Sequence, residues 1–192
     1  MPPKYVINDG CSLVFYIEDA LPPELSDQLL AWYREALGWR QKSSVYFGKS
    51  YEQQRMGYLM GKDYSFSGYT HESNPFDTPT RELLDKMNEL FQTNLNSALF
   101  WLYRKGTTDY IARHSDSKED LKPGSPIVGL SLGDTVKWRL TNKKDESIKH
   151  TFENKHGTIF VMAGNTQDHW YHEVMKKKHP CDRISITMRE FA

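Results

Sequence analysis

The second half of the chain, from Ser97 onward, constrains the fold most, because its apolar residues come in short runs separated by turn residues. These runs lack the three-to-four-residue spacing of a helix and have the length and alternation of strands. The expected strands are 97–104, 109–114, 126–132, 136–141, 148–153, 157–163, 169–174 and 182–190. Such a series indicates an antiparallel sandwich or jelly roll.

Two helical segments precede these strands. Residues 22–37 carry apolar side chains at helical spacing and are followed by Gly38, and a second helix begins at Thr78 and Pro79 with an apolar stripe ending at Phe91. A short strand is expected at 11–16 and a hairpin or loops at 39–60. No linker or repeat divides the chain. We therefore expect one domain over residues 1–192, an α+β fold that is mainly β, with the helices packed on one side.

Composition places the chain in a broad class. Hydrophobic residues make up 38% of its 192 residues and aromatic residues 13%, enough for a sizeable core. No stretch approaches the roughly 20 apolar residues of a membrane span, and the N-terminus lacks the pattern of a signal peptide. Only Cys11 and Cys181 occur, which fits a reducing compartment. We expect an intracellular, soluble monomer, with nucleus or cytoplasm left open.

Charge differs between the two halves of the chain. Lys plus Arg equals Asp plus Glu, at 25 each. Residues 1–100 hold 9 basic and 13 acidic side chains, a net of −4, and residues 101–192 hold 16 and 12, a net of +4. A basic face on the second half would suit phosphates, although an ordinary solvated surface explains the same counts equally well.

The strongest local signal is His114-x-Asp116 at the end of an expected strand. Residues two apart in a strand face the same side, so both side chains can bind one ion. His172 is the best candidate for a third ligand. Two histidines and one carboxylate form the facial triad of non-haem Fe(II) oxygenases. An H-x-D pair alone is weak evidence, because it occurs by chance in many sheets.

A second signal lies near the C-terminus. Alternation over residues 183–189 places Arg183, Ser185, Thr187 and Arg189 on one face of a strand and apolar residues on the other. Arginines on such a face often point to solvent. If the face lines a cavity, Arg183 can bind a carboxylate through paired hydrogen bonds.

These residues together resemble a known family, the AlkB-type dioxygenases. The resemblance rests on the order and spacing of His114-x-Asp116, the run 126–133, the run 157–162, His172 and Arg183-x5-Arg189. The runs 64–68 and 123–126 look like those of the eukaryotic homologues that repair alkylated DNA. The resemblance covers about residues 45–192. Several motifs in one order are much more specific than any one of them.

The resemblance implies a double-stranded β-helix, with a jelly-roll core over 97–192 and a nucleotide-recognition hairpin or lid at about 40–70. It implies that His114, Asp116 and His172 bind Fe(II). The cosubstrate 2-oxoglutarate would be bound by Tyr103 and Arg183 at its distal carboxylate, with Arg189, Trp101 and Thr187 in the same pocket. The implied reaction uses O2 to demethylate an N-alkylated nucleobase and releases formaldehyde, succinate and CO2.

For the substrate, the resemblance implies that Phe66 stacks on a flipped-out base, with Tyr64 and Ser67 beside it. Phe47, in the run 45–49, resembles a hydrophobic wedge that enters the duplex. Taken alone, an aromatic such as Phe66 is more often a core residue. Lysines at 143–144 and 176–178 are in expected loops, where they are either phosphate contacts or solvated surface.

Two residues depart from the family pattern. Trp101 stands where these enzymes usually carry an asparagine that binds 2-oxoglutarate, and it offers one N–H donor and more bulk. Lys118 stands where repair enzymes often place an acid that reads the base. Two alternatives therefore stay open: the same iron chemistry on a protein side chain or small molecule, and a catalytically silent module that binds nucleic acid.

Overall fold

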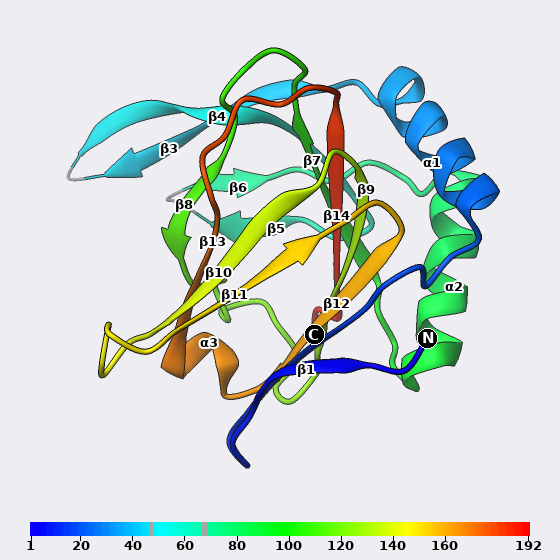
Figure 1. Ribbon diagram of the computed structural model, residues 1–192. Helices are drawn as coiled ribbons and strands as arrows, with labels where there is room; N and C mark the ends of the chain where they lie inside the picture. The colour runs from blue at the N-terminus through cyan, green and yellow to red at the C-terminus, as the bar shows by residue number, and fades with distance from the viewer. Residues whose placement is uncertain (47, 67–68) are drawn as a thin grey trace.

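The computed structural model describes residues 1–46, 48–66 and 69–192. They include two large antiparallel sheets packed face to face, a small two-stranded sheet, and two long helices on one outer side (Figure 1). The larger sheet has the strand order β1 (Lys4–Asn8), β2 (Ser12–Ile17), β12 (Thr158–Gly164), β9 (Ile127–Gly133), β14 (Arg183–Arg189), β7 (Ser97–Tyr103), β4 (Lys49–Met60) and β3 (Arg40–Tyr46). The smaller sheet has the order β11 (Lys149–Asn154), β10 (Val136–Asn142), β13 (Trp170–Val174) and β8 (Ile111–His114). This is a jelly-roll arrangement.

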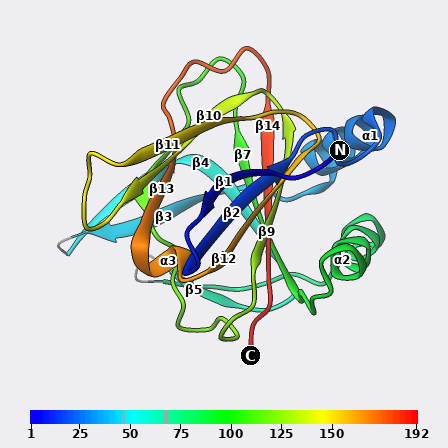
Figure 2. The same cartoon turned by 60° about the horizontal axis from the view of Figure 1, so that its bottom comes forward.

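The helices α1 (Pro23–Ala36) and α2 (Thr78–Phe91) cover the outer face of the larger sheet (Figures 1 and 2). The α2 helix begins at Asp77, whose carboxylate accepts a hydrogen bond from the Thr80 backbone N–H at 2.9 Å. Apolar side chains of both helices, including Tyr33 of α1 and Met87 of α2, share one cluster with Ile186 of β14. This layer forms the first hydrophobic core.

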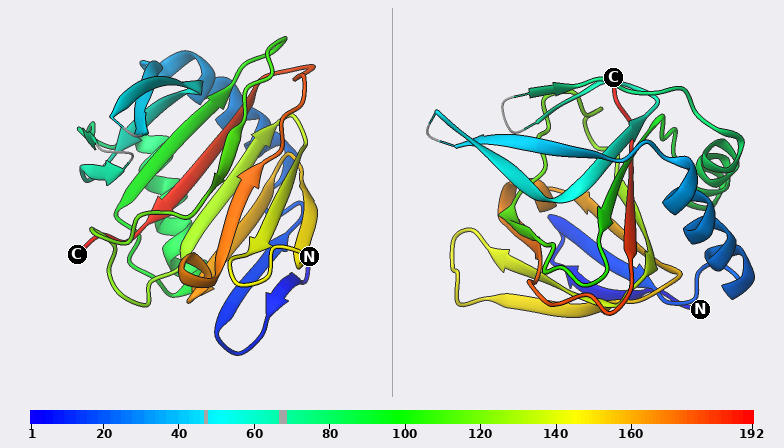
Figure 3. Two further views of the ribbon diagram at one scale, coloured as in Figure 1. Left: turned by 90° about the vertical axis from the view of Figure 1, so that its left-hand side faces the viewer. Right: turned by 90° about the horizontal axis from the view of Figure 1, so that it is seen from above.

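A second core lies between the two sheets, which Figure 3 shows as separate layers. It includes Leu99 and Phe160 from the larger sheet and Trp138 from the smaller one. Toward β8 and β13 the inner faces carry polar side chains, so the layer opens there into a cavity. The alternation in β14 gives it two faces, because Ile184 and Ile186 point to the helix layer while Ser185 and Thr187 line the cavity.

The secondary structure agrees with the sequence in most elements. The two helices and the strands expected from Ser97 onward are all present within a few residues, and residues 39–60 form a hairpin of β3 and β4. The sequence did not predict β1, the hairpin of β5 (Tyr64–Phe66) and β6 (Tyr69–His71), or the short helix α3 (Thr166–His169). The fold class, mainly β with a jelly-roll core, is confirmed.

Two further findings concern the whole described chain. Among its helices, none combines the length and the apolar character needed to cross a bilayer. Cys11 and Cys181 are both free and exposed.

Candidate active site

The sheet register brings two histidines together. His114 at the end of β8 is the Cα partner of His172 in β13, so their side chains lie opposite each other on the inner face of the smaller sheet. Their ring centroids are 4.2 Å apart. Asp116 follows β8 by two residues, and its backbone N–H donates to the Gln167 side-chain oxygen at 2.8 Å. The three predicted ligands therefore meet, and one ligand atom from each lies within 4.8 Å of the others.

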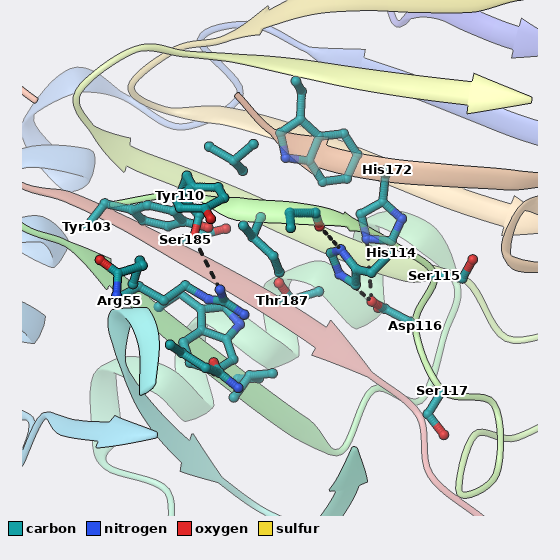
Figure 4. A pocket seen from close by; sticks show the side chains of 18 of the residues that line it. Arg55, Tyr103, Tyr110, His114, Ser115, Asp116, Ser117, His172, Ser185 and Thr187 are labelled. Carbon is teal, nitrogen blue, oxygen red and sulfur yellow. Dashed lines mark hydrogen bonds and ion pairs between the residues drawn. The ribbon is translucent and has the colours of Figure 1, made fainter. Parts of the chain in front are cut away.

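The two carboxylate oxygens of Asp116 face different partners, of which Figure 4 shows the two histidines. Oδ1 lies 3.5 Å from Nε2 of His114 and 3.4 Å from Nε2 of His172. Oδ2 accepts from Nη2 of Arg189 at 2.5 Å. Arg189 thereby leaves one oxygen for an ion shared with the histidines. Burial raises the pKa of Asp116, but Arg189 and the two histidines outweigh it and hold that pKa well below its usual range.

Both imidazoles are suited to coordinate through Nε2. Nδ1 of His114 lies 2.9 Å from the Ala112 carbonyl oxygen, an acceptor, and a hydrogen bond to this oxygen orients Nε2 toward Asp116 and His172. His172 is buried and stacks on Trp138 at 5.1 Å between centroids. Burial, followed by the charge of His114, lowers the pKa of His172 to about 4. A neutral imidazole is the form that binds a metal.

A cavity of about 820 Å³ opens beside these three residues. Its floor is the inner face of β7 and β14, and one wall is the first half of β4 (Figure 4). The lining includes Tyr51, Arg55, Tyr64, Leu99, Trp101, Tyr103, Tyr110, Ser185, Thr187 and Arg189. Aromatic and cationic side chains therefore surround the space next to the three candidate metal ligands.

Arg183 lies behind this cavity and does not line it. Its side chain is fully buried, with the guanidinium carbon 4.8 Å from the ring centroid of Tyr103, which does line the cavity. Among the described residues, none of its three side-chain nitrogens has a hydrogen-bond partner. A buried guanidinium without partners is costly, so its presence points to an anion that it binds.

A model of the family described as "2OG-Fe(II) oxygenase superfamily" matches residues 13–189. The chain belongs to this superfamily. Within it, the chain is of AlkB type. It is 30% identical to the human "Alpha-ketoglutarate-dependent dioxygenase alkB homolog 3" over 175 residues, covering 85% of this chain and 61% of that protein. It is 28% identical to "DNA oxidative demethylase ALKBH2" of Arabidopsis thaliana, covering 95% of this chain and 67% of that protein.

A solved structure shares the fold of this superfamily member. "The structure of OsALKBH1" matches with a TM-score of 0.64 and 16% identity, covering 98% of this chain and 100% of that one. This likeness concerns the fold alone. The chain spans about 61% of the human relative, so the activity and substrate of the whole protein are taken up below as proposals.

The residues present fit the two cofactors of a 2OG-Fe(II) oxygenase. Two imidazoles and one carboxylate oxygen are a donor set that suits Fe(II) and leaves positions open for other ligands. The partnerless guanidinium of Arg183 suits the distal carboxylate of 2-oxoglutarate. The three donors line the cavity, and Arg183 lies behind Tyr103, which belongs to the same lining.

Other residues predicted for the site are placed differently. Trp101, Thr187 and Tyr64 line the cavity, and the Tyr64 hydroxyl donates to the Ser117 carbonyl at 3.3 Å. Lys118 is exposed, forms an ion pair with Asp168 at 2.5 Å and is outside the cavity lining. Phe47, Ser67 and the side chain of Phe66 lie outside the described residues, and their roles stay predictions.

Arg55, Tyr110 and Trp138 also belong to the site, and the sequence did not single them out. Arg55 lies over the ring of Trp101 at 4.1 Å and donates to the Tyr110 carbonyl at 3.2 Å. Trp138 covers His172. Trp138 was placed in a strand by its pattern, but only the sheet register reveals that it faces His172. Arg55 comes from the hairpin, whose pairing with β7 has no sequence signature.

Proposed function

We propose that this chain is an Fe(II)- and 2-oxoglutarate-dependent dioxygenase that removes alkyl groups from N-alkylated nucleobases in DNA or RNA. One observation carries the proposal: the triad of His114, Asp116 and His172 opens onto a large cavity that ends near the partnerless guanidinium of Arg183.

Each side chain has a defined task in this proposal. His114 and His172 offer Nε2, and Asp116 offers the single oxygen that Arg189 leaves available. Arg183 and Tyr103 take the distal carboxylate of 2-oxoglutarate. When bound, iron, O2 and 2-oxoglutarate supply the oxidising power to hydroxylate an N-alkyl group, with succinate, CO2 and formaldehyde as products of demethylation. Trp138 excludes water from one side of His172.

A nucleobase is favoured over other substrates by two observations. The relatives named above include a "DNA oxidative demethylase" at 28% identity over 95% of this chain. The cavity also has aromatic rings at its border, including Tyr51, which is 53% exposed, and flat rings can stack on an extruded base.

A second candidate keeps the chemistry but places a protein side chain or small molecule in the cavity. Lys118 favours it, because a lysine paired with Asp168 outside the cavity cannot accept a hydrogen bond from an amino group of a base. The zero net charge also contrasts with the basic character expected of a duplex binder.

The decisive experiment incubates the protein with Fe(II), ascorbate, 2-oxoglutarate and a panel of single- and double-stranded methylated oligonucleotides. Mass spectrometry should detect repaired bases, with formaldehyde in matching amounts. Succinate formation without repair of any oligonucleotide would support the second candidate. Asp116→Ala should abolish succinate formation. If the wild type makes no succinate while it binds oligonucleotides, a catalytically silent binding module is the correct function.

A further inference from the structure

A buried polar cluster lies directly behind Tyr103 and Arg183, and the proposed reaction does not use it. Its centre is His179, in the connection between β13 and β14. His179 is 1% exposed, and its ring centroid is 5.8 Å from that of Tyr103. Its partners come from the turn after β7 and from the end of β9. The cluster therefore joins three parts of the chain at the far end of the cavity.

Both ring nitrogens of His179 have close partners, and both partners are acceptors. Nδ1 lies 2.8 Å from Oδ2 of Asp134, and Nε2 lies 2.8 Å from the backbone oxygen of Asp109. A carbonyl oxygen can only accept, and an ionised carboxylate can only accept. Lys177 lies against both oxygens of the same Asp134 carboxylate, at 3.0 and 2.8 Å, so this carboxylate accepts from a cation. Two acceptors at these distances call for a ring with N–H on both nitrogens.

Backbone hydrogen bonds of His179 join the same two segments that its ring joins. The His179 N–H donates to the Thr107 carbonyl at 3.0 Å, and its own carbonyl accepts from the Gly106 N–H at 2.8 Å. The Lys105 N–H donates to the Asp182 carboxylate at 2.7 Å. These hydrogen bonds hold the connection between β13 and β14 against the turn that follows β7.

The two hydrogen-bonded segments, the turn after β7 and the β13–β14 connection, adjoin Tyr103 and Arg183 in the chain. Tyr103 ends β7, Arg183 begins β14, and the two are Cα partners in the sheet. Gly133 is the other Cα partner of Arg183 and precedes Asp134. Gly133 has φ +86°, and a Cβ added there would lie 2.2 Å from the Asp182 backbone oxygen. Only glycine therefore fits this tight turn.

Charge links the cluster to Arg183 as well. Burial lowers the pKa of Arg183, and both Tyr103 and the Asp134 carboxylate oppose this effect. Because His179 and Lys177 hold Asp134 in place, they also fix the negative charge that stabilises the buried guanidinium.

We propose that His179 is a buried imidazolium that positions the cosubstrate end of the cavity. By donating to Asp134 and to the Asp109 carbonyl, it holds the β13–β14 connection on the turn after β7, and so keeps Tyr103 and Arg183 in place for a carboxylate. This inference rests on the role of Tyr103 and Arg183 in the proposed function.

The protonation of His179 can be observed without any reaction. Long-range ¹H–¹⁵N correlation spectra of the protein with ¹⁵N-labelled histidine, at neutral pH, should show two similar, protonated ring nitrogens for one slowly exchanging histidine. His179→Gln should remove that signal and identify it. Two unlike nitrogens, the signature of a neutral tautomer, would overturn the imidazolium assignment.

The positioning role is tested by binding. Calorimetry should measure the affinity of the Mn(II)-loaded protein for 2-oxoglutarate and, separately, of the metal-free protein for Mn(II). We expect His179→Gln to weaken 2-oxoglutarate binding about tenfold, because it breaks at least one charge-assisted hydrogen bond, and to change Mn(II) affinity less than about twofold. Tyr33→Phe, which removes a buried hydrogen bond to Thr80 in the helix layer, is the matched control and should change neither.

The outcomes separate the two proposals. If His179→Gln weakens both affinities equally, or neither, the positioning role is wrong. If Arg183→Lys leaves 2-oxoglutarate binding unchanged, the assignment of Arg183 in the proposed function is wrong instead. Should His179→Gln fail to fold, Lys177→Met keeps the ring and removes the second cation on Asp134. It should weaken 2-oxoglutarate binding about threefold, and an unchanged affinity would contradict the proposal.

Discussion

Arg189 is predicted to stabilise the metal-free protein about twice as much as the metal-loaded one. Its guanidinium and the Asp116 carboxylate form an ion pair whose side chains are only 6% and 8% exposed. Removing one partner of such a pair leaves an uncompensated buried charge and costs about 3–5 kcal/mol. For a chain of this size 1 kcal/mol shifts Tm by roughly 2–4 °C, so Arg189→Met should lower Tm by about 6–20 °C without metal.

With saturating Mn(II), an ion at the other oxygen of Asp116 would still compensate much of the carboxylate charge in the variant, so the loss should fall to about half. The assay is thermal unfolding of wild type and variant, each with and without Mn(II). Arg139→Met is the matched control, because the Arg139–Glu173 pair is partly exposed and not at the ligands, and it should shift Tm by less than about 4 °C in both conditions. Equal losses for Arg189→Met with and without Mn(II) would refute the reasoning.

The same pair makes a prediction about pH. Burial raises the pKa of Asp116, but Arg189 and the histidines lower it more, so the folded-state pKa is below that of an unfolded aspartate, about 3.9. The stability from this group is then fully present above that value and is lost as the pH falls through the lower folded-state pKa. The Tm difference between wild type and Arg189→Met should therefore narrow in acid.

Three further changes have defined outcomes. Asp77→Ala removes the α2 cap and should cost about 1 kcal/mol, seen as a Tm lower by about 2–4 °C. Gly129→Ala would place a Cβ 2.0 Å from the buried Phe160 ring and should cost at least about 1–3 kcal/mol in urea unfolding. Trp101→Leu removes the aromatic face under Arg55 and should raise KM for 2-oxoglutarate about tenfold in a succinate assay, whereas Trp101→Phe keeps that face and should raise KM less than about threefold.

The sequence predicted those parts of the fold that depend on local pattern. The alternation in residues 183–189 correctly separated the side of Ile184 from the side of Ser185. It could not predict that both sides are buried, because a second sheet and not solvent covers the polar side. His114 and His172 are 58 residues apart in the chain. They meet because of the register between β8 and β13, which pair only in the tertiary fold.

The elements that the sequence missed are those whose stability comes from distant partners. β1, with the sequence KYVIN, is too short to show a clear pattern of its own and is held at the sheet edge by its pairing with β2. Arg55 had no motif, because its role depends on β4 pairing with β7, which places it over Trp101. His179 also gave no signal in the sequence, since its two acceptors belong to residues 45 and 70 positions away.

Trp101 shows how a departure from a family pattern can be accommodated without loss of the site. In the sheet it lies between Gly57 of β4 and Ser185 of β14, and these two small neighbours leave the width that an indole needs. Arg55 then covers the ring at 4.1 Å. Where an asparagine would present an amide to the cavity, this chain presents the indole of Trp101 and the guanidinium of Arg55. Differences in what this protein binds are therefore expected where Trp101 of β7 meets Arg55 of β4, and not at His114, Asp116 and His172.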